Sequence, residues 1–401
     1  MKHTSTTSPR SNPTSTRSRR RFSSIRAMGA QLADLRDDLH SNLRTDLRGL
    51  RAELRAKGRL ARDLMSCATD PYRPIVVNLI VTRRCNLSCS YCFEYDKVSP
   101  PVPLETLKER VDHLRRLRAI IVTLTGGETL LHPELEELVA YIRDSGMTPV
   151  MNTNAYLLTR ERVLALNEAG LFAMQISVDN VKPNESTKKS LKPLLPKLRM
   201  LAEHAAFRVR INTVLGSGPP EEAVEVARVV TELGFDAKCS LLRDEDGVPV
   251  AVDARARQAY DDIRAMGRRG TALLSEDFQM PIIERGQIDW KCRAGARFFH
   301  VCENGLVHLC APRTGMPGKP LADYTEADIR REFYTPKSCA SKCPVAYAHQ
   351  ASRIDWFRSQ PGIEPRATGA QPDAAAVPGS LMADPTIVPV QSLVSRVRPA
   401  A

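Results

Sequence analysis

The chain has 401 residues, of which 42% are hydrophobic and 26% charged, so it can bury a large core. Its formal net charge of +12 is concentrated at the start, because residues 1–26 hold seven Lys and Arg residues and no acidic residue. The rest of the chain carries only +5 (12 − 7), and a nucleic-acid-binding stripe on the folded surface is therefore not expected. The longest apolar run, residues 75–81, is too short to span a membrane.

Ten cysteines without a convincing export signal favour a reducing, cytoplasmic location and metal binding in preference to disulfides. The run at 18–22 imitates a twin-arginine export signal, but charged residues follow it where an apolar stretch is required. An organelle transit peptide stays open as an alternative, because the start of the chain is rich in Ser and Arg and poor in acidic residues.

The first part of the chain changes character near residue 27. Residues 1–26 have almost nothing to bury and are predicted to be a disordered basic tail. From 27 to about 64, leucines recur every three or four residues among mixed charges, and this pattern predicts a long amphipathic helix within a helical segment 27–70. Its charges nearly balance, which favours packing on the rest of the chain or on a second copy over binding to a membrane surface.

The middle of the chain alternates strand and helix patterns. Apolar, strand-like runs occupy 75–82, 119–124, 148–152, 172–178, 208–215 and 235–241. Amphipathic helical patterns lie between them. Six repeated βα units predict an α/β fold with a parallel sheet, right-handed crossovers and helices outside. In barrels of this kind the reactive groups gather on the loops that follow the strands.

A cysteine triplet directly follows the first predicted strand. Cys85, Cys89 and Cys92 have the spacing C-x3-C-x2-C. Three thiolates cannot complete a four-ligand zinc site, whereas on a four-iron cluster they leave one iron open to a small molecule. A zinc knuckle or a chance cluster of cysteines is the alternative.

The triplet, with Tyr91 just before its last cysteine, resembles the signature of the radical S-adenosylmethionine (SAM) superfamily. The resemblance implies a partial (β/α)6 TIM-like barrel over 71–280 and a 4Fe-4S cluster whose open iron binds SAM. It also implies an electron donor such as flavodoxin or ferredoxin, and a 5'-deoxyadenosyl radical that abstracts hydrogen from a substrate.

Further motifs follow the next three predicted strands. Thr125-Gly126-Gly127-Glu128 resembles the family's GGE motif, in which backbone groups and the carboxylate receive the ammonium of SAM. The turn at Asn154 and the Ser-x-Asp sequence after the fourth strand resemble positions that lie beside SAM in the family. The alternative is that both are ordinary turns without a role in binding. The resemblance thus assigns SAM binding to Tyr91, Gly126, Gly127, Glu128, Asn154, Ser177 and Asp179.

A second cysteine set lies further along, at Cys292, Cys310, Cys339 and Cys343. The hairpin signal Asn304-Gly305 would bring the first two thiols together. Four thiolates suit zinc or iron–sulfur equally. The pattern resembles SPASM and twitch domains, which implies an auxiliary 4Fe-4S cluster in a small Cys-rich α+β extension over 281–348. Cys302 is a substitute ligand in this scheme, and residues 349–401 are predicted to be a loosely ordered tail.

These observations predict a radical SAM enzyme that modifies a peptide or small-molecule substrate. No sequence feature separates the two substrate classes. The alternative is a non-catalytic zinc-binding adaptor that uses its basic tail on nucleic acid.

Overall fold

The computed structural model describes residues 54–92, 95–244, 247–267, 278–314 and 316–358. The predicted basic tail, residues 27–53 of the predicted helix and residues 359–401 lie outside these ranges. Residues 54–66 are helical. Residues 1–61 and 62–401 are two separate units, and the fold described below belongs to the second.

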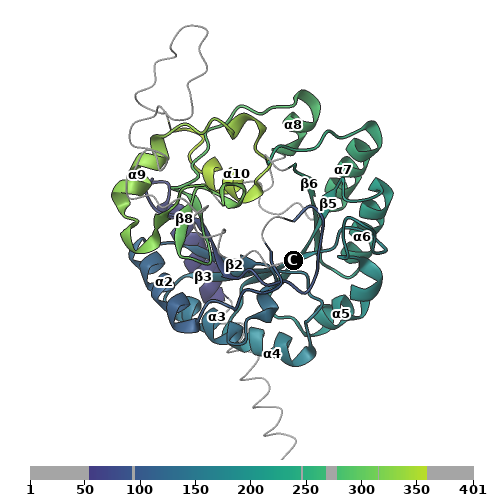
Figure 1. The fold of residues 1–401 in the computed structure, drawn as a ribbon, viewed down its shortest axis with the longest axis horizontal. Coiled ribbons are helices and arrows are strands. Elements are labelled where there is room, and N and C mark those ends of the chain that lie inside the picture. The colour runs from purple at the N-terminus through teal and green to yellow at the C-terminus, as the bar shows by residue number, and fades with distance from the viewer. Residues whose placement is uncertain (1–53, 93–94, 245–246, 268–277, 315, 359–401) are drawn as a thin grey trace, which may run out of the picture. The chain divides into compact units, whose positions relative to one another are not determined.

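One nine-stranded sheet organises the fold, with the strand order β6-β5-β4-β3-β2-β1-β7-β8-β9 (Figure 1). Six neighbouring strands run parallel, in chain order: β1 (Val76–Thr82), β2 (Ile121–Gly126), β3 (Thr148–Thr153), β4 (Ala173–Ser177), β5 (Arg208–Leu215) and β6 (Asp236–Leu241). All six were predicted, with ends shifted by no more than about two residues. The predicted partial barrel of six β/α units is therefore confirmed.

Helices cover the outside of the parallel strands (Figure 1). They are α2 (Leu104–Arg116), α3 (Leu135–Asp144), α4 (Arg160–Ala169), α5 (Leu191–His204), α6 (Pro220–Glu232) and α7 (Ala254–Met266). Strand β5 shows why the sheet has two different faces. Its residues Val209 and Ile211 are buried in the core beneath the helices, whereas Arg210 and Asn212 line a cavity on the inner face.

The C-terminal part extends the same sheet. Strand β7 (Phe298–Val301) pairs in parallel with β1, and β8 (Leu306–His308) and β9 (Lys319–Pro320) add antiparallel strands. The predicted Asn304-Gly305 turn joins β7 to β8, with Gly305 at φ 79°, a conformation that glycine adopts readily. The cysteine-bearing extension is thus continuous with the barrel.

Three helices complete the extension: α8 (Gln279–Arg285), α9 (Glu326–Tyr334) and α10 (Ala346–Arg353). Helix α10 continues beyond position 348, so the first residues that the sequence assigned to a loose tail are helical.

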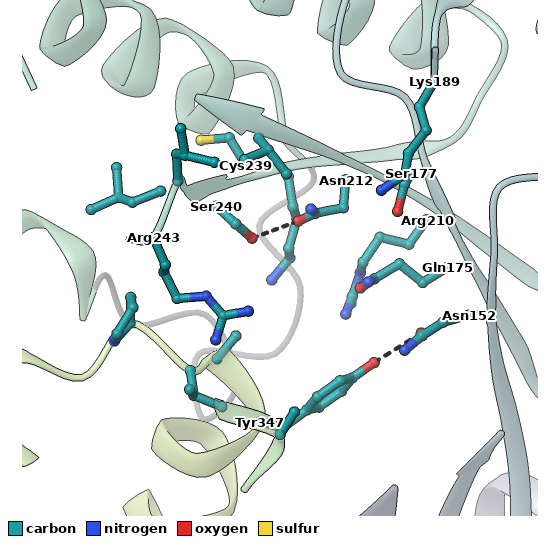
Figure 2. Close-up of a pocket in the computed structure, with 18 of the residues that line it drawn as sticks. Asn152, Gln175, Ser177, Lys189, Arg210, Asn212, Cys239, Ser240, Arg243 and Tyr347 are labelled. Carbon is teal, nitrogen blue, oxygen red and sulfur yellow. Dashed lines mark hydrogen bonds between the residues drawn. The ribbon is translucent and has the colours of Figure 1, made fainter. Parts of the chain in front are cut away.

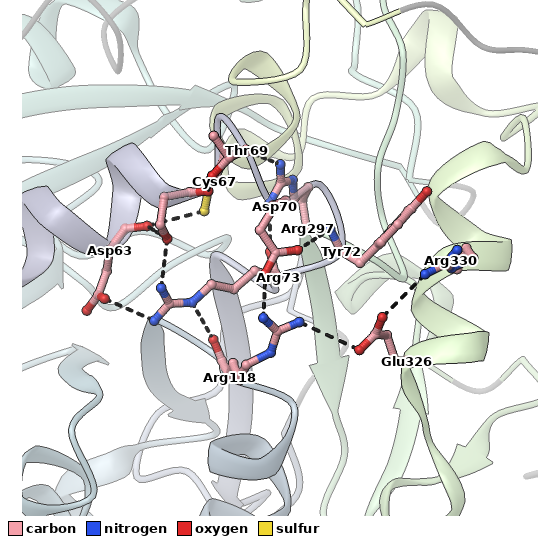
Figure 3. Close-up of polar contacts among 11 residues, drawn as sticks. Asp63, Cys67, Thr69, Asp70, Tyr72, Arg73, Arg118, Arg297, Glu326 and Arg330 are labelled. Atoms are coloured by element: carbon pink, nitrogen blue, oxygen red, sulfur yellow. Dashed lines mark hydrogen bonds and ion pairs between the residues drawn. The ribbon is translucent and has the colours of Figure 1, made fainter.

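A buried ion pair ties the end of the described chain to the start of the barrel. The guanidinium of Arg297 binds both carboxylate oxygens of Asp355 at 2.7 and 2.9 Å, and both side chains are fully buried. The same guanidinium donates to the backbone carbonyls of Cys67, Asp70 and Arg73. Figure 3 shows the polar network around this point. Removing one partner would leave an uncompensated buried charge, which is strongly destabilising.

Candidate active site

The predicted cysteine triplet lies at the mouth of the barrel. Cys85, Cys89 and Cys92 follow β1 and line one cavity of about 790 Å³ at the C-terminal ends of the parallel strands. The backbone N–H of Leu87 donates to the sulfur of Cys85 at 3.4 Å. Burial raises the pKa of Cys85, and this hydrogen bond opposes the shift. The described residues of the loop therefore present three thiols to a single space.

Two glycines hold the cysteine loop in place. The N–H of Gly127 donates to the carbonyl of Thr82 at 2.8 Å, just before the loop begins. A Cβ on Gly127 would lie 2.3 Å from the carbonyl oxygens of Arg83 and Arg84, and a Cβ on Gly126 would lie 2.1 Å from that of Thr82. No side chain fits between these backbones, so the glycines allow β2 to approach the cysteine loop.

Glu128 lies behind the cavity and not on its wall. Its side chain is fully buried, and its carboxylate accepts from the N–H of Leu130 at 3.0 Å, the N–H of Asn154 at 2.7 Å and the hydroxyl of Thr153. Burial raises the pKa of Glu128, and these donors partly offset it. In this arrangement the carboxylate joins the loops after β2 and β3, and direct contact with SAM remains a prediction.

The polar residues predicted after β3 and β4 occupy one level of the barrel. Ser177 on β4 is in register with Asn212 on β5, and Asn154 follows the strand next to β4. All three line the cavity. Asp179 is different, because it is fully buried, accepts from Thr187 at 2.9 Å and does not line the cavity. Of the seven predicted cofactor residues, five therefore line the cavity and two support it.

Lys189, which the sequence analysis missed, lies beside the cysteine loop. Its ammonium donates to the hydroxyl of Tyr91 at 3.1 Å, and that hydroxyl in turn donates to Asp179. Burial alone would lower the pKa of Lys189, but its electrostatic interactions with Tyr91, Asp179, Cys89 and Cys92 outweigh burial and raise the pKa. The lysine thus supplies a positive charge where thiolates need one. Lys189 lies in the loop between β4 and α5, where the sequence has no alternating strand pattern that could indicate which side chains face the cavity.

The floor of the cavity is also polar. Asn152, Gln175 and Arg210 occupy one row across β3, β4 and β5. Tyr347 of α10 donates to the side-chain oxygen of Asn152 at 3.2 Å. Figure 2 shows these residues facing the same space, with Arg243 beside them. A signal for Arg210 did exist in the sequence, since charged and amide residues alternate with apolar ones along β5.

Comparison with known families decides what this architecture is. The model of the Radical SAM superfamily matches residues 79–242, which contain most of β1 and all of β2 to β6. Residues 79–242 form a region of the radical SAM superfamily. Its members are enzymes that use a 4Fe-4S cluster and SAM, and the predicted recognition is therefore confirmed.

Individual relatives match parts of the chain. It is 31% identical to Fe-coproporphyrin III synthase of Methanosarcina barkeri (33% of this chain, 34% of that protein). It is 30% identical to GTP 3',8-cyclase of Aquifex aeolicus (40% and 55%) and 36% identical to PqqA peptide cyclase of Bradyrhizobium diazoefficiens (27% and 30%). The matches thus span about a third to about half the length of these curated relatives.

Solved structures support the same fold. The crystal structure of Streptococcus suis SuiB bound to precursor peptide SuiA superposes with a TM-score of 0.52 at 15% identity, covering 64% of this chain and 65% of that chain. The likeness concerns the fold. It agrees with six parallel β/α units followed by an antiparallel, cysteine-bearing extension.

The residues around the triplet fit the family's cluster. Thiols are its soft ligands, a backbone N–H already points at the sulfur of Cys85, and Lys189 offsets negative charge on Cys89 and Cys92. Within the described ranges, no three His, Cys, Asp or Glu side chains are arranged closely enough to hold a single metal ion. A cluster asks for a wider spacing, because each thiolate binds a different iron.

The second cysteine set is gathered in one region of the extension, where Cys292, Cys310 and Cys343 are buried and Cys339 is exposed. Burial raises the pKa of Cys310, and the charges of Cys343, Cys292 and Cys339 raise it further. Burial likewise raises the pKa of Cys292 to about 11 and that of Cys343 to about 12. The four predicted ligands therefore lie within electrostatic range of one another.

Cations surround this second set. Arg313 hydrogen-bonds the Cys339 side chain, Lys337 lowers the pKa of Cys292, and Arg243 lowers that of Cys343. Such charges favour the thiolates that metal binding requires. Cys302, the suggested substitute ligand, lies instead near Glu303 and Arg110.

Two further observations concern residues outside the two cysteine sets. His132 is buried, its Nε2 is 2.9 Å from the carbonyl of Val102, and its Nδ1 accepts from the N–H of Glu134, so both ring nitrogens have protein partners. This agrees with a structural role and not a metal ligand. No helix in the described part of the chain is both long and apolar enough to cross a bilayer.

Proposed function

We propose that this chain cleaves SAM reductively at a 4Fe-4S cluster held by Cys85, Cys89 and Cys92, and that it uses the product to modify a peptide or small molecule in the adjoining cavity. One observation carries the proposal. The three thiols, the glycine pair Gly126 and Gly127, and the polar floor all line a single cavity of about 790 Å³.

The residues after the strands are suited to holding SAM. Backbone groups near Gly127 can approach a ligand closely, since no Cβ covers them. Asn154, Ser177 and Asn212 offer amide and hydroxyl groups at one level for polar parts of the nucleoside. Lys189, next to the cysteine loop, can pair with the carboxylate of SAM.

The cofactors supply the radical chemistry when they are bound, and the protein's task is orientation and exclusion of water. The extension contributes to that task, because Tyr347 of α10 reaches the cavity floor and hydrogen-bonds Asn152. Pro344 and Val345, just before α10, and Ala346 at its start also line the cavity. The substrate would thus bind between the barrel floor and this extension.

We assign an auxiliary iron–sulfur cluster to Cys292, Cys310, Cys339 and Cys343, with Arg313, Arg243 and Lys337 as neighbouring cations. Tyr347 stands where a full SPASM domain would have a further cysteine, so a single auxiliary cluster is proposed. We also propose a flavodoxin- or ferredoxin-like electron donor and a cytoplasmic location.

The relatives do not decide between substrate classes. PqqA peptide cyclase and SuiB are named for peptides, whereas GTP 3',8-cyclase and Fe-coproporphyrin III synthase are named for small molecules. The family match, which covers the cysteine loop and the six parallel strands, supports an enzyme over the non-catalytic zinc adaptor.

The test is anaerobic reconstitution of the full chain with iron and sulfide, followed by SAM and a strong reductant. The expected product is 5'-deoxyadenosine, measured by chromatography, together with a Mössbauer spectrum of a cubane cluster. Cys85→Ala should abolish the product, whereas Cys67→Ala, at a buried thiol in another region, should retain it. A colourless protein that binds only zinc, or product formation by Cys85→Ala, would refute the proposal.

A further inference from the structure

The cavity has more positive than negative charge on its walls. Its cationic lining residues are Lys189, Arg210, Lys238, Arg243 and Arg264, and its acidic ones are Asp236 and Asp261. Both acids already face an arginine. Asp236 binds Arg210 at 2.9 Å, and Asp261 lies 3.9 Å from Arg264. Among the described residues that line the cavity, five cations therefore face two carboxylates.

The positive charge of Lys189 already has partners in the cysteine loop. It donates to Tyr91, and its electrostatic partners include Cys89 and Cys92. A negatively charged cluster and the carboxylate of SAM would both lie near it. Lys238 and Arg243 lie elsewhere on the cavity wall, and Arg243 also acts on Cys343 of the second cysteine set.

Lys238 lies on β6, in register with Asn212 on the inner face of the barrel. Within the described residues its ammonium has no hydrogen-bond or ion-pair partner. Burial lowers its pKa, and the nearby charge of Arg210 lowers it further, while Asp236 opposes the shift. An unpaired ammonium in a half-buried site is costly unless a ligand with a negative charge completes it.

Arg243 follows β6 and reaches the same space from the wall. Figure 2 shows its guanidinium directed into the cavity, across from Arg210 and above Tyr347. Ser240 and Asn212, joined by a hydrogen bond of 2.9 Å, lie on the inner face between these cations. Guanidinium and ammonium groups flanked by amides and hydroxyls form the environment in which proteins bind carboxylate or phosphate.

We propose that the substrate carries an anionic group, a carboxylate or a phosphate, and that Lys238 and Arg243 bind it, with Arg210 below. This inference rests on the proposed function and narrows its substrate class. A neutral or cationic substrate would leave Lys238 unpaired in the closed site. The same two residues would place the anionic end away from the cysteine loop and thereby orient the rest of the substrate toward SAM.

The experiment is calorimetric titration of the full-length reconstituted protein with inorganic phosphate and, separately, with N-acetylglycine, which carries a single carboxylate. Saturating SAM is present so that its carboxylate occupies Lys189 and the probes do not bind there. At least one probe is expected to bind saturably. Lys238→Met and Arg243→Met should each weaken binding about tenfold or more, since a hydrogen bond to a charged group contributes about 1.5–3 kcal/mol.

Two further variants serve as controls. Lys238→Arg keeps the charge and should retain most of the binding. Arg255→Met removes an exposed arginine that pairs with Glu221 on the outer surface, and it should bind like the unmodified protein. If Lys238→Met does not fold, Arg243→Met and Lys238→Arg still decide the question.

Each outcome has a defined meaning. Preference for phosphate indicates a phosphorylated substrate, preference for N-acetylglycine indicates a carboxylic acid, and equal binding supports an anion of either kind. Absence of binding by both probes, or binding that Lys238→Met and Arg243→Met leave unchanged, overturns the inference. The 5'-deoxyadenosine assay is run on the same preparation, so failure of SAM cleavage is observed separately from failure of anion binding.

Discussion

The two cysteine sets differ in how they meet the solvent. Cys85, Cys89 and Cys92 all line the large cavity, and the first and last of them are partly accessible, whereas Cys292, Cys310 and Cys343 are buried within the extension and only Cys339 of that set is exposed. Three thiolates on an open cavity leave a metal position free for a small ligand, whereas four thiolates can complete the ligand set. The difference suggests that the barrel site performs the chemistry and that the extension supports the substrate or an electron.

The largest expected effect comes from a substitution that disturbs the backbone packing of the barrel cysteine site. In Gly127→Ala the new methyl group would lie 2.3 Å from two carbonyl oxygens, so the cysteine loop must move. We expect loss of the barrel cluster and a drop of 5'-deoxyadenosine formation by at least 100-fold. Gly146→Ala meets no atom within 4 Å and should keep its iron, although its positive φ costs some stability. Iron content and product yield are the measurements.

The next largest effect tests whether the second cysteine set functions separately from the barrel set. Cys339→Ala removes one of its four thiols and should lower iron bound per chain by the share of the auxiliary cluster. SAM cleavage without substrate should remain within about twofold, because the barrel cysteines are unchanged. If instead cleavage disappears while the barrel cluster is still seen by Mössbauer spectroscopy, the two sets act together.

A third prediction concerns the stability of the extension. Asp355→Asn leaves the buried guanidinium of Arg297 without its counter-charge. We expect a loss of about 3–5 kcal/mol in the free energy of unfolding, measured by urea denaturation. Asp144→Asn, at an exposed pair with Arg143, should change it by less than about 1 kcal/mol. Equal effects from both variants would contradict the anchoring role of Arg297.

The smallest expected effect is a pH dependence within the extension. His300 is fully buried, and burial together with the charge of His308 lowers its pKa to about 3. The unfolded chain, with an ordinary histidine pKa near 6.5, therefore binds more protons between these values. The contribution of His300 to the free energy of unfolding is therefore complete above about pH 6.5. It falls by about 1.4 kcal/mol per pH unit as the pH decreases towards 3.

The substitution His300→Leu should remove this contribution from the pH dependence of the free energy of unfolding, measured by urea denaturation between pH 7 and pH 5. Leu164→Gln, at an exposed position of α4 without a titratable side chain, is the comparison variant and should leave the slope unchanged. A wild-type slope identical to that of His300→Leu would show that the histidine is not held neutral in the folded state.

Much of the fold could be predicted because its signals are local. The alternation along β5 and the leucine spacing of α2 depend on residues that are neighbours in the chain. The same holds for Cys85, Cys89 and Cys92, whose ligand spacing is contained in eight residues. Gly126 and Gly127 were also recognised from local sequence, although their contact with Thr82, Arg83 and Arg84 was not.

The sequence by itself determined the six β/α units, the family and the open cysteine loop, since short-range periodicity and spacing encode them. Only the tertiary structure decided that β7 pairs with β1, that Glu128 and Asp179 lie behind the cavity, and that Lys189 and Lys238 face it. These features depend on strand order and on side chains brought together from distant positions. No local pattern records which residues will share a cavity after the sheet has curved.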